Sequence, residues 1–178
     1  GIVPANSVQA ASLKIRYSGK TRYYKGKQLH VSYANKNLSS KYVGIQINKV
    51  NMIPYYDYLV KQGPKVKRTY SKSSGKLILK NGDDTLTAYV GKRTYYLNGV
   101  KKTFSVAPTK VKYYKTKKTI ILIPANAIVK GLGLNYKYSS SSKRIYITQP
   151  VIPSDSTTQV QTQPSGSVQY TNYNKSLS

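Results

Sequence analysis

The segment Ile53–Lys61, with the sequence IPYYDYLVK, occurs a second time in altered form as Ile123–Lys130, with the sequence IPANAIVK. After each copy the chain passes through glycine and then a stretch rich in lysine and tyrosine. Each copy ends on a strand-like segment, Gly75–Leu79 in the first and Lys143–Ile147 in the second. A repeat of this kind indicates a fold built from two similar units.

The resemblance between the copies extends upstream, where Gly19–Tyr24 (GKTRYY) is matched by Gly91–Tyr96 (GKRTYY). Leu13–Tyr17 alternates apolar and polar residues, which is the period of a half-buried strand. Pro54 and Pro124 fit the first turn of a short helix, because proline has no amide hydrogen to lose there and its φ is already helical. Each copy therefore predicts strands around one short helix.

Two Asn-Gly pairs predict tight hairpins, since both residue types accept the positive φ that such turns require. Asn98-Gly99 lies inside the second copy, and Asn81-Gly82 lies between the copies. A tight turn between the copies favours one rigid two-lobed unit over two domains on a flexible linker. The fold class predicted is α+β.

The predicted organisation has four parts. Residues 1–12 form a leader, residues 13–80 the first repeat, residues 81–149 the second repeat, and residues 150–178 a tail or linker rich in Pro, Ser, Thr and Gln. In the leader, Val8-Gln9-Ala10 followed by Ala11 has small residues where signal peptidase needs them. We therefore expect residues 1–10 to be the end of a secretion signal; the alternative is an ordinary flexible leader.

The charge of the chain is extreme. Thirty Lys and Arg residues stand against four acidic ones, a formal net charge of +26, and 19 tyrosines supply most of the aromatic content. Such a field attracts polyanions and accelerates their association. The expected partners are anionic cell-wall polymers or acidic glycans, and the alternative is a charge that serves solubility alone. No apolar run reaches the roughly 20 residues of a membrane span.

Residues with catalytic or metal-binding chemistry are scarce. The chain has one histidine, His30, no cysteine and four acids, whereas a typical zinc or copper site needs three or four such ligands. Asp57 has no acidic or imidazole partner for general acid–base work. No nucleophile elbow or glycine-rich phosphate loop occurs. The sequence predicts no catalytic residue, no metal, no cofactor and no enzyme activity.

Surface recognition remains, and the densest basic segment is Lys110–Lys118. In a strand Lys110, Lys112 and Tyr114 share one face, and the alternate residues share the other. The alternative is a solvated strand with its tyrosines in the core. The candidate polyanion-binding residues are Lys110, Lys112, Tyr113, Tyr114, Lys115, Lys117 and Lys118, with lesser patches at Lys101 and Lys102 and at Lys65, Lys67 and Arg68.

Several segments together resemble the bacterial copper amine oxidase N-terminal-like, or stalk, domain family. The matching segments are Gly91–Gly99 (GKRTYYLNG), Ala107-Pro108, Leu122–Pro124 (LIP), Gly131–Gly133 (GLG), Tyr136–Tyr138 (YKY) and Arg144–Ile147 (RIYI). The resemblance covers roughly residues 13–148. It implies, for each repeat, an antiparallel sheet curved around a short helix, and a stalk whose copper ligands belong to a separate catalytic domain.

The chain departs from the family pattern at two places. The arginine of the family's Pro motif is replaced by Tyr56 and Asn126, and the Trp-Asp after the helix by Thr69-Tyr70 and Lys137-Tyr138. Polar contacts that the family makes through those residues are therefore not carried over to this chain.

The leading hypothesis is a secreted, non-catalytic cell-surface module that associates by charge with anionic wall polymers or acidic glycans. The first alternative is a purely structural spacer or assembly domain. The second is a nucleic-acid-binding protein, which is disfavoured because export does not suit it and no nucleic-acid motif occurs. The sequence indicates no oligomeric state.

Overall fold

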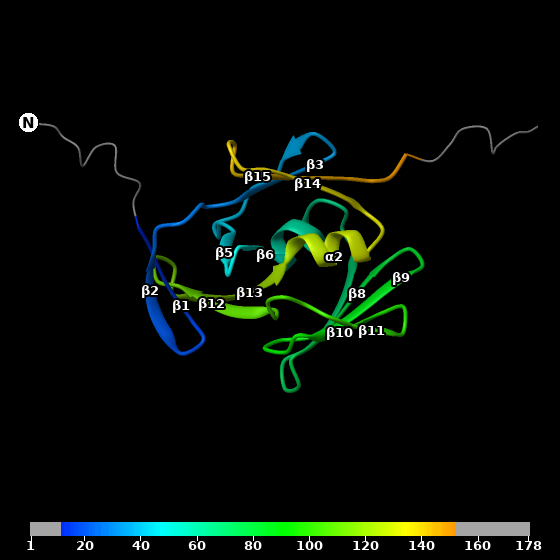
Figure 1. Cartoon of the computed structure of the whole chain (residues 1–178), viewed down its shortest axis with the longest axis horizontal. Helices are drawn as coiled ribbons and strands as arrows, with labels where there is room; N and C mark the ends of the chain where they lie inside the picture. The colour runs from blue at the N-terminus through cyan, green and yellow to red at the C-terminus, as the bar shows by residue number, and fades with distance from the viewer. Residues whose placement is uncertain (1–11, 152–178) are drawn as a thin grey trace, which may run out of the picture.

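A computed structural model describes residues 12–151 of the chain. The predicted leader and tail lie almost entirely outside these residues. Three β-sheets surround two short helices (Figure 1). All strand pairs in the described part are antiparallel except β15 with β3.

The first sheet has six strands in the order β2-β1-β12-β13-β6-β5 and is curled. Its strands are β1 (Leu13–Tyr17), β2 (Lys20–Tyr24), β5 (Ile45–Ile47), β6 (Val50–Pro54), β12 (Thr109–Tyr113) and β13 (Lys118–Pro124). The two Ile-Pro segments lie at the ends of β6 and β13, which are neighbours in this sheet. The copies of the repeat therefore meet along one strand pair.

The second sheet has five strands in the order β11-β10-β9-β8-β7, and the third has four in the order β14-β15-β3-β4. The second consists of β7 (Lys67–Ser71), β8 (Lys76–Asn81), β9 (Asp84–Tyr89), β10 (Thr94–Leu97) and β11 (Val100–Thr103). The third consists of β3 (His30–Tyr33), β4 (Lys36–Asn37), β14 (Asn135–Ser139) and β15 (Arg144–Thr148). The last strands of the first repeat, β7 and β8, therefore belong to the second sheet, and the last strands of the second repeat, β14 and β15, belong to the third.

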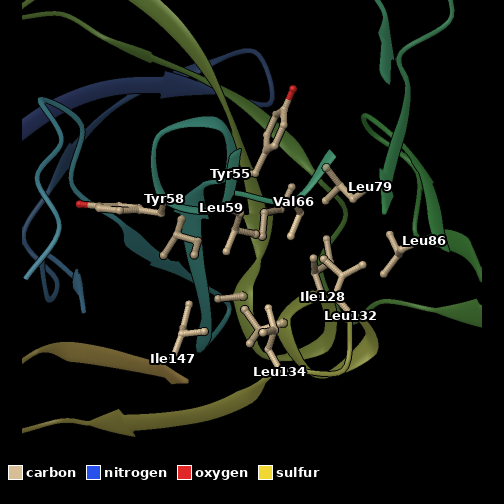
Figure 2. Close-up of a cluster of buried hydrophobic side chains, with 14 of the residues drawn as sticks. Tyr55, Tyr58, Leu59, Val66, Leu79, Leu86, Ile128, Leu132, Leu134 and Ile147 are labelled. Atoms are coloured by element: carbon tan, nitrogen blue, oxygen red, sulfur yellow. The ribbon is translucent and has the colours of Figure 1, made fainter. Parts of the chain in front are cut away.

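A π-helix, η1 (Tyr56–Lys61), follows β6, and an α-helix, α2 (Ala125–Gly131), follows β13. Both helices bury one side in a cluster that also draws on all three sheets; Figure 2 shows Leu59 and Val66 from the first repeat near Ile128 and Leu134 from the second. Tyr55, Tyr58 and Leu59 are buried. A second cluster, around Ile15, Met52 and Tyr113, lies on one side of the curled sheet.

Both predicted hairpins are present. Asn81 pairs with Asp84 around the β8–β9 turn, and Leu97 pairs with Val100 around Asn98-Gly99. Asn98 has φ +51° and Gly99 has φ +81°, the positive values that the tight turn requires. The predicted boundary between residues 80 and 81 lies at the end of a hairpin strand, and as a domain boundary it stays a prediction.

The prediction for the two prolines is wrong in detail. Pro54 and Pro124 are the last residues of β6 and β13, and Pro124 is extended, with φ −66° and ψ +109°. The proline ring fixes φ at a value that helix and extended chain share. Strand pairing of Pro54 with Leu122 and of Pro124 with Met52 holds ψ of each proline at an extended value. Each helix therefore begins after its proline.

The structure confirms a mostly β protein with two short helices, consistent with the predicted α+β class. It does not confirm the division into two lobes. The larger buried cluster contains Ile53 and Leu79 from the first repeat together with Ile123 and Ile147 from the second.

Candidate polyanion-binding surface

The basic segment of β12 has β1 as its neighbour, and β2 follows β1 at the edge of the curled sheet. Arg16 pairs with both Lys112 and Thr21, and the amide of Tyr114 donates to the carbonyl of Lys14 over 3.2 Å. Residues paired across strands point to the same side of a sheet. The outward side chains of Lys14, Arg16, Tyr23, Lys112 and Tyr114 therefore share one surface, called here the β1–β2–β12 face.

Cations and rings alternate on the β1–β2–β12 face. The Lys14 ammonium lies 4.5 Å from the centroid of the Tyr114 ring and 5.8 Å from that of Tyr23. The Lys112 ammonium lies 4.9 Å from the centroid of the Tyr114 ring, which directly follows β12. Ammonium groups at such distances are attracted by the ring's negative face. The contacts hold these lysines near the rings; Lys14 is exposed and Lys112 is half-buried.

Hydrogen bonds order the middle of the face. The Arg16 guanidinium donates to the Thr21 hydroxyl over 3.1 Å, and that hydroxyl shares a 3.1 Å hydrogen bond with the Tyr114 phenol. The bond to Thr21, followed by the positive charges of Lys112, Arg16 and Lys14, lowers the pKa of Tyr114 below its usual value. The hydrogen bond is the main cause of this shift, and the three neighbouring positive charges act in the same direction.

The acids of the described chain lie elsewhere. Asp57 is in η1 and accepts a 2.7 Å hydrogen bond from Ser40. Asp84 begins β9 and accepts one from Asn98, and Asp83 is in the adjacent turn. None of these carboxylates belongs to the curled sheet. The charge of the face is therefore available to an external anion.

The structure confirms the predicted alternation along β12, and it removes one candidate from the surface. Lys110 is exposed, and Val111 and Tyr113 are buried. Tyr113 keeps 3% of its surface exposed, donates its hydroxyl hydrogen to the Val43 carbonyl over 2.6 Å, and packs edge-on against Tyr42. Burial raises the pKa of this phenol. Tyr113 is a core residue, because its position faces the smaller buried cluster, and it cannot contact a surface ligand.

The other basic candidates are spread over the molecule. Lys115, Lys117 and Lys118 are exposed around the β12–β13 turn. The strand β11 carries Lys101 and Lys102, and Lys65, Lys67 and Arg68 lie at or just before the start of β7. These two strands are the opposite edges of the five-stranded sheet. These sets do not adjoin one another within that sheet.

Arg68 differs from the other candidates because its side chain is already engaged. Its guanidinium donates to the Tyr55 hydroxyl over 3.1 Å and lies 4.9 Å from the centroid of the Tyr56 ring. Lys65 and Lys67 line a small cleft of about 270 Å³ with Lys80. The β7 edge therefore offers a lysine cluster, with Arg68 holding η1 against the sheet.

Sequence reasoning missed Lys14, Arg16 and Tyr23. The alternation in Leu13–Tyr17 already places Lys14 and Arg16 on one side of a strand, and that signal was present in the sequence. The position of this strand beside β12 depends on pairing across almost a hundred residues, for which no local pattern exists.

The part of the chain between residues 12 and 151 contains no group of three His, Cys, Asp or Glu side chains able to hold a metal ion. His30 is exposed on β3. Partial burial, and then the charges of Arg144 and Lys143, lower its pKa. One imidazole without two further His, Cys or carboxylate ligands beside it does not make a copper site, so residues 12–151 do not fit that metal.

No helix in the described part is long and apolar enough to cross a membrane. Together, the fold and the surface define a mostly β module with an uncompensated cationic face and no assembled metal-ligand group among the described residues.

The model of the copper amine oxidase N-terminal domain family matches residues 34–147, more than half of the chain. The chain belongs to this family, and the resemblance drawn from the segments between Gly91 and Ile147 is confirmed. In copper amine oxidases this domain is separate from the catalytic domain. The match indicates a stalk-like, non-catalytic module. Neither a curated protein nor a solved structure matches the chain significantly.

Proposed function

We propose that this protein is a secreted, non-catalytic cell-surface module that associates electrostatically with anionic cell-wall polymers or acidic glycans through the β1–β2–β12 face. The observation that carries the proposal is the cluster of Lys14, Arg16 and Lys112 around the rings of Tyr23 and Tyr114, without an acid in the same sheet.

The arrangement suits a linear anionic polymer. Side chains two residues apart on one strand are roughly 6.6 Å apart, so Lys110 and Lys112 present a row of charges along β12. The exposed Tyr23 ring adds an apolar surface beside that row. Charge supplies long-range attraction, and the ring supplies contact area for the sugar or polyol part.

Export is supported by the sequence Val8–Ala11, with its small residues at signal-peptidase positions. These residues lie outside the described part of the chain. Expression of the full gene and fractionation of the culture tests this part of the proposal. Protein confined to the cytoplasmic fraction contradicts it.

Binding is tested with purified walls that contain teichoic acid, at increasing salt concentrations. The variant Lys14→Gln/Arg16→Gln/Lys112→Gln removes three charges from the face. The matched control Lys67→Gln/Lys101→Gln/Lys102→Gln removes three charges from the edges of the five-stranded sheet. We expect affinity to fall steeply with salt, and the first variant to make the salt slope shallower by about one for each lost contact.

If both variants lose the same affinity for walls, net charge alone explains binding, and the β1–β2–β12 face is not the binding surface. Wall binding that is absent, or insensitive to salt, contradicts polyanion association altogether. The second candidate, a purely structural spacer, then gains support, because the matched family domain is a stalk-like module.

A further inference from the structure

A cleft of about 700 Å³ opens between the curled sheet and the five-stranded sheet. Loops from both sheets form its walls. Its lining includes three cations, Lys72, Arg93 and Lys110, and side chains with hydroxyl groups such as Ser73, Ser105 and Thr109. The volume lies within the roughly 300–1,000 Å³ typical of small-ligand sites. The lining comes from the connections β1–β2, β5–β6, β7–β8, β9–β10 and β11–β12. Because these five connections are far apart in the sequence, the site exists only in the folded chain.

The charge of the cleft has one sign. Lys72 comes from the β7–β8 turn, Arg93 from the connection before β10, and Lys110 from β12, and no acidic residue is in the lining. Three cations from separate elements line one cleft, and like charges that share a site repel one another, so a bound anion lowers their electrostatic energy. This feature points to an anionic ligand.

Arg93 is held in place by the backbone. Its Nε donates to the Phe104 carbonyl over 2.8 Å, and the Phe104 amide donates to the Arg93 carbonyl over 2.8 Å. Phe104 is buried and stacks on Tyr95 with ring centroids 3.8 Å apart. The terminal nitrogens of the guanidinium therefore extend from a rigid support. A positioned guanidinium matches the oxygens of phosphate or sulfate in a fork-like geometry.

The remaining lining suits a sugar. Hydroxyl groups of Ser18, Ser73, Ser74, Ser105 and Thr109 and the amide of Asn48 surround the cations, and apolar atoms of Val106 and Pro108 lie among them. Sugars present hydroxyl groups at their edges and carbon–hydrogen bonds on their faces. A lining with both polar groups and apolar surface fits that pattern.

We infer that this cleft is a site for a single sugar unit that carries phosphate or sulfate. The inference goes beyond the proposed function, because it concerns one discrete unit in a concave site and not a polymer along an exposed face. Lys110 lines the cleft and is also on the side of β12 that carries Lys112. The two sites therefore adjoin and share Lys110, whereas Lys72 and Arg93 line only the cleft and Lys14 and Arg16 are only on the β1–β2–β12 face.

The test uses the folded chain labelled with ¹⁵N, titrated with glucose 6-phosphate and separately with glucose 6-sulfate. We expect saturable shifts of the Gly75, Gly91 and Ser105 amides, which line the cleft. The probe that binds more tightly identifies phosphate or sulfate as the anion. Glucose and inorganic phosphate are the control ligands, and each is expected to bind at least about tenfold more weakly because it satisfies only part of the lining.

The variant Lys72→Gln/Arg93→Gln is expected to weaken sugar binding roughly tenfold or more, because two charge-assisted contacts are lost. Lys72→Gln alone changes an exposed turn and reports on the site even if the double variant unfolds. The control Lys14→Gln/Arg16→Gln is expected to keep the cleft shifts, which separates this inference from the proposed function.

Three results overturn the inference. The first is the absence of saturable cleft shifts with both sugars. The second is inorganic phosphate binding as tightly as glucose 6-phosphate, which indicates a non-specific anion. The third is unchanged affinity in Lys72→Gln and in the double variant.

Discussion

Ile53 lies directly opposite Ile123 where β6 pairs with β13, and both side chains are completely buried. On one side of this pair Pro54 of the first copy faces Leu122 of the second, and on the other side Pro124 of the second copy faces Met52 of the first. Because Pro54 corresponds to Pro124 and Met52 to Leu122 in the repeat, these two pairs are equivalent. The two copies therefore meet around a local two-fold relationship at this isoleucine pair. Each strand then leads into a helix that packs in the same cluster.

Truncation of either isoleucine is expected to destabilise the whole chain. We expect Ile53→Ala and Ile123→Ala each to lower the free energy of unfolding by about 2–5 kcal/mol, through lost burial and a cavity at the junction. Urea unfolding followed by circular dichroism measures the change. Val100→Ala is the control, since Val100 is 58% exposed on β11 and should change stability by less than about 0.5 kcal/mol. Near-native stability of either isoleucine variant contradicts a shared core.

Tyr58 links stability to alkaline pH. Burial, together with the nearby Asp57 carboxylate, raises the pKa of Tyr58 to about 12 from its usual 10.0. Between these values the unfolded chain releases the phenolic proton while the folded chain retains it, so stability falls as pH rises from 10 to 12.

We expect the wild type to lose roughly 2–3 kcal/mol more than Tyr58→Phe over this interval, since one pKa unit corresponds to about 1.4 kcal/mol. Denaturant unfolding at pH 9, 10, 11 and 12 measures the difference. Parallel stability curves for the two proteins contradict the expectation.

Tyr114 is expected to titrate at lower pH than its usual value because of the Thr21 hydrogen bond and the surrounding cations. Thr21→Val removes the hydroxyl and should raise the pKa of Tyr114. Thr21→Ser keeps the hydroxyl and is the matched control. The ¹³Cζ resonance of Tyr114, followed against pH, gives the value. A pKa that is the same in Thr21→Val and wild type shows that the bond does not form in solution.

Asn98 combines two roles in the β10–β11 turn. It adopts φ +51°, its side-chain oxygen accepts from the Thr85 amide over 2.8 Å, and its amide donates to Asp84 over 2.9 Å. Asn98→Gly keeps the backbone freedom and loses the hydrogen bonds, whereas Asn98→Ala loses both. We expect losses of about 1 kcal/mol for glycine and about 2 kcal/mol for alanine.

Thermal unfolding of the two Asn98 variants and the wild type measures how much stability each substitution removes. If alanine is tolerated as well as glycine, the turn conformation contributes nothing to stability.

Local patterns predicted the elements well. The Asn-Gly turns, the alternation of Lys110 and Lys112 with buried Val111, and the helices after Pro54 and Pro124 all follow from short-range rules. The exact role of the prolines did not, because one ring conformation is compatible with both strand end and helix start. The partner strand resolves that ambiguity.

The candidate site was predictable only in part. The charge of Lys112 and its orientation away from Val111 follow from the strand period. The surrounding Lys14, Arg16 and Tyr23 come from a hairpin far away in the sequence, and the cleft around Arg93 is formed by five connections. Neither grouping leaves a local signature.

The sequence by itself determined the repeat, the family, the short elements and the excess of positive charge, since these depend on residue type and on spacing within a few positions. The tertiary structure decided that the copies join at Ile53 and Ile123, that Tyr113 is in the core, and that Lys14 lies 4.5 Å from the Tyr114 ring. The physical reason is that strand pairing and core packing bring together residues far apart in the chain, and the many possible pairings differ in free energy only when the whole chain is packed.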